Sequence, residues 1–136
     1  MESFTVEAVH LTWEQERRLL VMTFGAGRRT LATESAARAL IAQMDRWLQA
    51  SPGPFRLLVD CSGLKDTEPG WRATFSGFFQ DHRGEVAIAW YNMTPLVRMT
   101  VTLFILATRI TGKAAGTEEE ARQWILAQRL AQAPPP

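Results

Sequence analysis

The side chains best suited to chemistry in this sequence are one cysteine and two histidines. Cys61 ends an apolar run, whereas His10 and His82 lie far from it along the chain. A cysteine nucleophile needs an imidazole within hydrogen-bond reach, and no motif brings either histidine to Cys61. Free cysteine is also among the residues most often buried as a small apolar side chain. We therefore expect Cys61 to be a core residue rather than a catalytic one.

Three carboxylates lie close together in the sequence, and such oxygen ligands could hold a hard cation. They are Asp60, Asp66 and Glu68. Helix capping and loop hydrogen bonds explain each of them separately. The glycine-containing stretch 25–29 (GAGRR) lacks the spacing and the Lys-Ser/Thr ending of a phosphate-binding loop. We therefore expect no metal, no cofactor and no catalytic activity.

Length and composition are those of one globular domain. The chain has 136 residues, of which 46% are apolar and 21% charged. Its net charge of +1 gives no field that would favour nucleic acid or an anionic membrane. Because a single cysteine cannot form an internal disulfide and the first residues do not form a signal peptide, the expected compartment is the cytoplasm. The apolar stretch 93–110 is interrupted by Arg98 and Arg109, so we expect a core or interface helix rather than a membrane span.

The stretch 55–61 (FRLLVDC) is typical of a central strand that is buried on both faces. In open α/β sheets, ligands and partners usually meet the fold at the carboxyl edge of such strands. The polar residues that follow, beginning with Ser62, are therefore expected at the functional edge of the sheet.

Apolar periodicity predicts strands and helices that alternate along the chain. Strands are expected at 4–11, 19–24, 55–61 and 86–91, with a short edge strand within 111–116, a charged turn at 13–18 and a loop at 63–70. Helices are expected at 34–49, 69–80, 95–110 and 118–131, with Thr33, Asp66 or Thr67, Thr94 and Thr117 as N-caps, and Thr117 and Glu120 as a capping box. This order predicts an α/β fold with a mixed sheet of about four to five strands, mostly parallel with an antiparallel first hairpin, and four helices. Residues 1–131 would form one domain, and 132–136 a disordered proline-rich tail.

Three short stretches, together with this order of elements, point to a known family. The stretches are 58–64 (LVDCSGL), 92–98 (NMTPLVR), and 117–121 (TEEEA) followed by Trp124 and Ile125. In these the chain resembles the STAS family, the fold of anti-sigma-factor antagonists, and it is most similar to the SpoIIAA-like branch grouped with STAS/Sec14 domains. The resemblance spans roughly residues 4–130. It implies a bacterial, cytoplasmic regulatory module that binds another protein and is not an enzyme.

The resemblance also bears on phosphorylation. Antagonists of this family carry a phosphorylated serine within an Asp-Ser-Ser-Gly-Leu segment at the start of the second helix. The matching stretch here is 66–70 (DTEPG), which aligns Thr67 with the first serine and Glu68 with the phosphoserine. Glu68 would then supply a fixed negative charge at a helix N-terminus, where the helix dipole favours it. Thr67 is a candidate phosphorylation site, with plain helix capping as the favoured alternative.

The predicted helices at 69–80 and 95–110 are apolar on more than one side. A helix that is apolar on most of its surface must pack against other elements on more than one side. An uncovered surface rich in aromatic residues and Met is typical of an interface. We therefore expect the loop 62–70 and these helices to dock a regulatory protein or to form a homodimer. The predicted partner-binding residues are Ser62, Asp66, Thr67, Glu68, Trp71, Phe75, Phe78, Met99 and Leu103. The alternative is a Sec14-like domain that binds a lipid or an apolar small molecule between the aromatic helices.

Overall fold

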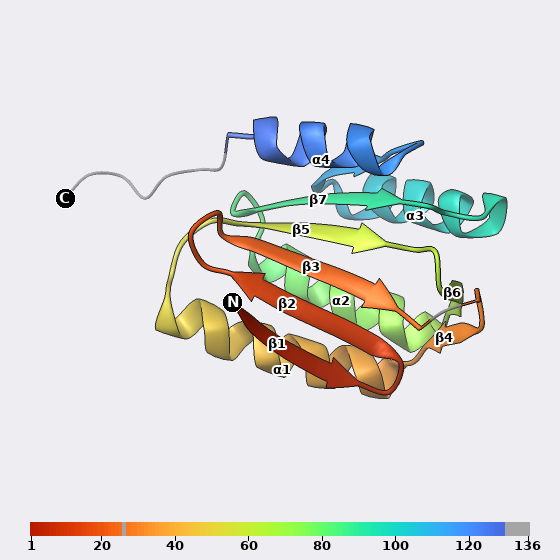
Figure 1. Ribbon diagram of the computed structural model, residues 1–136, viewed down its shortest axis with the longest axis horizontal. Helices are drawn as coiled ribbons and strands as arrows, with labels where there is room; N and C mark the ends of the chain where they lie inside the picture. The colour runs from red at the N-terminus through yellow and green to blue at the C-terminus, as the bar shows by residue number, and fades with distance from the viewer. Residues whose placement is uncertain (26, 130–136) are drawn as a thin grey trace.

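The structure is a computed structural model that describes residues 1–25 and 27–129. Within these residues the strands are β1 (Glu2–Val6), β2 (Val9–Glu14), β3 (Leu19–Phe24), β4 (Thr30–Ala32), β5 (Phe55–Asp60), β6 (Leu64–Thr67), β7 (Val86–Tyr91) and β8 (Thr111–Ala114). The helices are α1 (Glu34–Ala50), α2 (Pro69–Asp81), α3 (Pro95–Thr108) and α4 (Glu118–Ala127). Figure 1 shows their arrangement around one large sheet.

The large sheet has six strands in the order β1-β2-β3-β5-β7-β8. The pairs β1–β2 and β2–β3 are antiparallel, whereas β3–β5, β5–β7 and β7–β8 are parallel. The apolar strand β5 has neighbours on both sides, which explains why its sequence is apolar on both faces. The predicted α/β fold, with a mixed sheet and four helices, is confirmed. The predicted number of four to five strands is wrong, since the sheet has six.

The extra strand arises because the predicted first strand at 4–11 is a hairpin. Val6 pairs with Val9 across a two-residue turn, in which Glu7 has a positive φ of 52°. In β1 the apolar residues that face the core stand at even positions, and in β2 they stand at odd positions. This change across the turn makes the alternation of apolar and polar residues in the sequence irregular. Strand β2 then continues through Trp13 and Glu14, which were expected in the charged turn.

Two short strands, β4 and β6, pair in parallel to form a separate small sheet. It lies beyond the carboxyl end of β5 (Figure 1). The predicted loop at 63–70 is therefore wrong in its first half, because residues 64–67 form β6. Asp66 and Thr67 belong to this strand and do not cap α2. The N-cap of α2 is Glu68, whose side chain makes no capping hydrogen bond to that helix.

The other three predicted N-caps are confirmed. Each threonine hydroxyl accepts a hydrogen bond from the backbone N–H three residues on, at Thr33 for α1, Thr94 for α3 and Thr117 for α4. The capping box differs in one bond, because the Glu120 carboxylate accepts from the N–H of Gly116 rather than from that of Thr117. Its charge still lies at the positive end of α4.

Helices α3 and α4 end earlier than expected. Helix α3 ends at Thr108 instead of residue 110, with Arg109 in the left-handed region. Helix α4 ends at Ala127 instead of residue 131, and the predicted proline-rich tail lies outside the described residues. No helix in the described part of the chain combines the length and the apolar character needed to cross a membrane.

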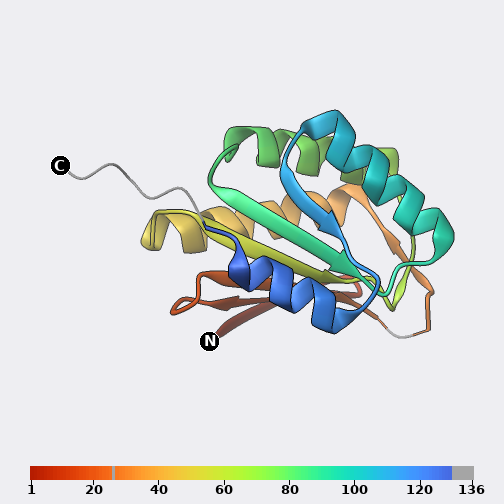
Figure 2. The same cartoon turned by 90° about the horizontal axis from the view of Figure 1, so that it is seen from above.

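The helices cover the two faces of the sheet unequally. Helices α1, α2 and α3 lie on one face and α4 on the other (Figure 2). Successive residues of β5 point to opposite faces of the sheet, so that Leu57 and Val59 face the three helices and Leu58 faces α4. The layer with three helices holds most of the core and all the aromatic residues of α2.

Candidate functional site

The aromatic residues of α2 are buried. Trp71, Phe75 and Phe78 are 8%, 3% and 5% exposed, and the rings of Trp71 and Phe75 lie 4.7 Å apart between centroids. Helix α2 is covered by the sheet below and by α1 and α3 on its two sides. These three side chains therefore do not form the exposed surface that the sequence analysis expected. Because these side chains are covered on all sides, they are part of the hydrophobic core.

The packing around these aromatic residues leaves an apolar cavity of about 60 Å³. The sheet contributes Met22, Leu57, Val59 and Trp90 to its lining, and the helices contribute Trp71, Phe75, Val101 and Phe104. The cavity lies at the carboxyl half of the central strands, on the side of the three helices. A mostly apolar cavity of this kind can accept apolar groups.

A groove of about 730 Å³ runs over the outside of the molecule between α2 and α3. Small residues on α2, Ala73 and Ser76, form one side, and Leu96 and Leu103 form part of the other. We call it the α2–α3 groove. It shares Asp66, Thr67, Arg72, Thr100 and Phe104 with the apolar cavity. The groove and the cavity therefore meet at these five residues.

Charged groups are scarce at this junction. Only Arg72 and Asp66 carry a charge among the residues that line the cavity and the groove. Nη1 of Arg72 donates to the backbone oxygen and to the hydroxyl of Thr67, each at 2.7 Å. Oδ1 of Asp66 accepts from the backbone N–H of Thr67 at 2.8 Å. Within the described residues, no carboxylate oxygen lies within 4.0 Å of the Arg72 guanidinium.

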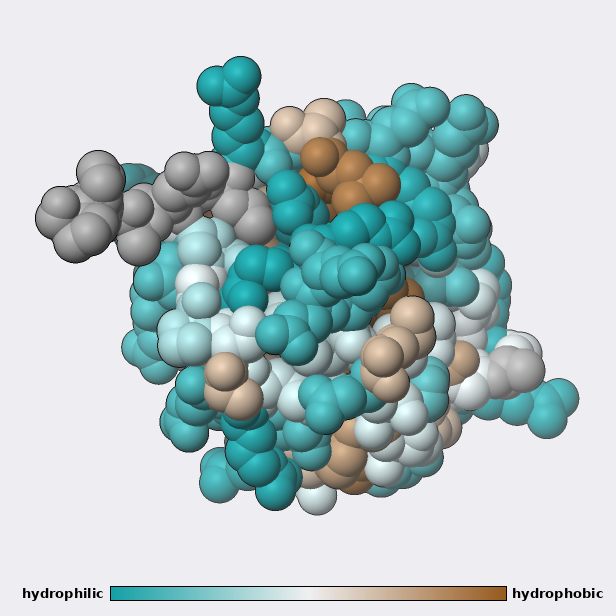
Figure 3. Space-filling view, turned by 60° about the vertical axis from the view of Figure 1, so that its left-hand side comes forward, coloured by the Kyte–Doolittle hydropathy of each residue, from teal (hydrophilic) through white to brown (hydrophobic). Residues whose placement is uncertain are grey.

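The outer side of α3 carries an exposed apolar stripe. Leu96, Met99, Leu103 and Leu106 are 51%, 56%, 58% and 69% exposed. Their spacing of three, four and three residues places them along one side of the helix. We call these four residues the α3 stripe. The face drawn in Figure 3 is mostly hydrophilic, with hydrophobic residues in small separate groups.

The remaining predicted site residues lie elsewhere. Ser62 is exposed in the turn after β5, where its backbone N–H donates to Oδ1 of Asp60 at 2.9 Å. Oε1 of Glu68 accepts from the backbone N–H of Glu34 at 2.9 Å. Glu68 therefore stands at the N-terminus of α2 as its N-cap, but its carboxylate bonds to the N-terminus of α1 instead of to that of α2. Neither Ser62 nor Glu68 lines the cavity or the groove.

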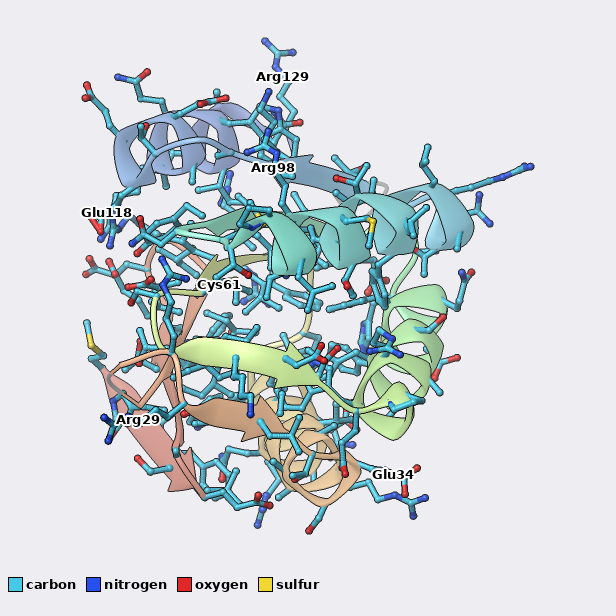
Figure 4. All side chains as sticks on the ribbon, turned by 90° about the vertical axis from the view of Figure 1, so that its right-hand side faces the viewer. Arg29, Glu34, Cys61, Arg98, Glu118 and Arg129 are labelled. Atoms are coloured by element: carbon cyan, nitrogen blue, oxygen red, sulfur yellow. The ribbon has the colours of Figure 1, made fainter. Side chains whose placement is uncertain are left out.

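Cys61 is fully buried at the carboxyl edge of the sheet. Figure 4, which looks onto this edge, labels Cys61 in the interior of the view, with Glu118 and Arg98 above it and Arg29 below it. Burial, with a smaller contribution from the Asp60 carboxylate, raises the pKa of the Cys61 thiol to about 12. The thiol is therefore protonated near neutral pH and is a poor nucleophile.

The histidines do not approach Cys61. The ring of His82 lies 5.3 Å from that of Phe55, at the opposite end of β5, so the length of the strand, roughly 20 Å, separates it from Cys61. His10 lies on β2 and its Nδ1 contacts the hydroxyl of Thr5 at 2.7 Å. Across residues 1–25 and 27–129, no three His, Cys, Asp or Glu side chains are grouped so that they could hold a metal ion.

Three residues at the junction of cavity and groove were not among the predicted site residues: Arg72, Thr100 and Phe104. A signal for Arg72 was present, because it is the only charged residue between positions 69 and 80. Thr100 and Phe104 are four residues apart and so lie on the same side of α3. Their spacing could not reveal which side that was, because α3 is apolar on more than one side.

Comparison of the chain with protein-family models and with curated proteins finds no match in either case.

Proposed function

We propose that this chain is a non-catalytic binding domain that holds an apolar small molecule between α2 and α3. The observation that carries the proposal is the apolar cavity that opens into the α2–α3 groove. Ligand sites are concave, mostly apolar and furnished with a few polar groups, and this description fits the junction at Arg72, Thr67 and Thr100. The aromatic side chains of α2 contribute as the wall of this site rather than as an exposed surface.

The sizes of the two spaces indicate how such a ligand would lie. The cavity of about 60 Å³ is smaller than the cavity of about 150 Å³ that accepts benzene in another protein. It therefore holds only one end of a ligand. The rest would extend into the groove, where Leu103 and Phe104 offer apolar surface. A slender, mostly apolar molecule fits this combination best.

Calorimetric titration with decanol tests the proposal, because decanol is a slender, mostly apolar molecule of the kind that the cavity and the groove fit. Thr100→Phe should block the junction and weaken binding by at least about tenfold, the equivalent of about 1.4 kcal/mol. Thr102→Phe is the matched control, since Thr102 is exposed on α3 and lines neither space. Absence of saturable binding to the wild type, or equal affinities of the two variants, would contradict the proposal.

A second candidate function is the docking of a regulatory protein, and the α3 stripe favours it. Four large apolar side chains exposed along one helix are typical of a groove or helix partner. The segment 86–117 contains no acidic residue. Arg98 stands between Leu96 and Met99 in the sequence and Arg109 follows the end of α3. Neither forms an ion pair within the described residues. The partner that fits this surface is an amphipathic helix with acidic residues beside its apolar face.

Two synthetic helical peptides test this second candidate. Both carry leucines at the spacing of the α3 stripe, and their other positions are rich in Glu in one peptide and in Lys in the other. The Glu peptide should bind, and Leu103→Ser should weaken it, whereas Leu126→Ser on α4 should not. Equal binding of both peptides would count against the surface. Dimers seen by light scattering would point instead to a second copy of the chain.

Membership of the STAS family belongs to this proposal. The order of elements and the carboxyl-edge position of the 58–64 stretch support it, as does the negative charge of Glu68 near a helix N-terminus. A regulatory role in the cytoplasm and phosphorylation of Thr67 follow only from that resemblance. The Thr67 hydroxyl accepts a hydrogen bond from Arg72, so a phosphate there would need this contact to rearrange. Phosphopeptide mass spectrometry of the protein from its native cell tests the modification.

A further inference from the structure

The inference concerns the charge of the ligand, and it rests on the proposed function. We propose that the ligand is an apolar acid and that Arg72 binds its carboxylate where the cavity and the groove meet. The proposal is built on three features of this junction: a single cation, the absence of an ion-pair partner for it, and apolar surface on both sides.

The first feature is the position of Arg72. Its side chain lines both the cavity and the groove, so it can reach a ligand that occupies either space. The guanidinium is only partly exposed to solvent, since its hydrogen bonds to Thr67 are half-buried. A cation in such a place interacts with an anion more strongly than a fully exposed cation does.

The second feature is the free donor capacity of Arg72. Two hydrogen bonds to Thr67 use Nη1, and Nε and Nη2 make none within the described residues. Nε and Nη2 together form the fork that binds both oxygens of a carboxylate. The two bonds to Thr67 hold the guanidinium in place at the end of β6. The guanidinium is therefore held in place, with this fork free of hydrogen bonds to the described residues, before any ligand arrives.

The third feature is the surroundings. Phe104 of α3 and Trp71 of α2 place apolar surface next to the junction, and Thr100 adds a hydroxyl. A molecule with a carboxylate at Arg72 would leave its apolar body in contact with these rings. Asp66 is the one group at the junction that opposes an anion. Because its carboxylate accepts the Thr67 N–H, it has a structural role that does not require charge.

Calorimetric titration with decanoate and with decanol tests the proposal, since the two compounds share a chain and differ in charge. The wild type should bind decanoate about tenfold more tightly than decanol, as expected for a charge-assisted pair. Arg72→Gln should remove this preference, so that decanoate and decanol bind with affinities within about twofold of each other. Arg83→Gln is the matched control, because Arg83 is exposed beyond the end of α2 and lines neither space.

Asp66→Asn tests the role of charge at the junction by removing the negative group there. The amide oxygen can still accept the Thr67 N–H, so the variant should fold and should show a larger preference for decanoate over decanol than the wild type does. Arg72→Lys keeps the charge without the fork and should lose part of the preference, which gives a readout if Arg72→Gln does not fold.

The outcomes separate this inference from the proposed function. Saturable binding of decanol without any preference for decanoate would overturn the role of Arg72 and leave the apolar site standing. Binding of decanoate that is unchanged in Arg72→Gln would have the same meaning. Binding of neither compound would overturn both proposals.

Discussion

Arg18 holds the loop between α1 and β5 through its guanidinium. It donates to four acceptors there: the backbone oxygens of Ser51, Gly53 and Pro54, and the Ser51 hydroxyl. The guanidinium carbon also lies 5.3 Å from the centroid of the Trp13 ring. One side chain thus satisfies the polar backbone that follows α1 and fixes where the central strand begins.

Replacement of Arg18 should therefore be strongly destabilising. We expect Arg18→Ala to lower the free energy of unfolding by about 2–3 kcal/mol, because several acceptors lose a charged donor. Arg17→Ala, next to it, removes only an exposed ion pair with Glu14 and should change the free energy of unfolding much less, because solvent screens such a pair. Urea denaturation of the two variants measures the difference. Equal effects would contradict this role of Arg18.

Cys61 and Tyr91 should make the free energy of unfolding depend on pH in the alkaline range. Burial, with the Asp60 charge, raises the pKa of Cys61 from 9.0 to about 12 and that of Tyr91 from 10.0 to about 12. Between pH 9 and 12 the unfolded chain has released protons that the folded chain retains. The free energy of unfolding should therefore be highest below pH 9 and should fall as pH rises through this window.

Denaturation of wild type, Cys61→Ala and Tyr91→Phe at a series of pH values checks this expectation. Each variant lacks one of the two titrating groups, so its free energy of unfolding should decline less steeply above pH 9 than that of the wild type. Identical pH dependence in all three proteins would show that neither group titrates as described.

At the scale of elements, the β5–β6 turn positions the entrance of the site. Gly63 lies in this turn, and a Cβ atom there would be 1.7 Å from the backbone oxygen of Gly25 and 2.6 Å from that of Phe24. The close approach brings the end of β3 against the start of β6, the strand that carries Asp66 and Thr67. Only glycine allows this contact.

Two glycine substitutions test this packing. Gly63→Ala should lower the free energy of unfolding by about 3 kcal/mol or more, because two backbone segments must move apart. Gly77→Ala in α2 meets nothing within 4 Å and should raise it by about 0.5–1 kcal/mol, since alanine suits a helix interior better. Thermal unfolding of both variants gives the comparison, and tolerance of Gly63→Ala would contradict the close approach.

The elements predicted best were those with a complete local signal. Thr33, Thr94 and Thr117 each precede a run with helical periodicity, and each caps a helix in the structure. Strands β4 (TLA) and β6 (LKDT) are too short to show a period, and they exist because they pair with each other. The turn at Glu7 and Ala8 lacks the glycine or asparagine that usually marks a hairpin. Such features depend on contacts that a local pattern does not contain.

At the scale of the whole molecule, the unequal distribution of helices determines where a site can form. Of the predicted site residues, Asp66, Thr67, Trp71, Phe75 and Leu103 line the cavity or the groove, whereas Ser62, Glu68, Phe78 and Met99 do not. The sequence could predict that α2 and α3 carry excess apolar surface. It could not predict that α1 and α3 both cover α2, which turns Trp71 and Phe75 from a surface into the wall of a cavity.

The central claim is that an apolar ligand enters the space between α2, α3 and the sheet. Methyl NMR spectra recorded during titration with decanol test it most directly, because they locate the bound molecule. The account predicts shifts for the methyl groups of Val97, Val101, Leu57 and Val59, which line the cavity. It predicts none for Leu58 and Ile125, which lie on the opposite face of the sheet. Shifts confined to Leu103 and Leu106 of the α3 stripe, or to the α4 face, would contradict it.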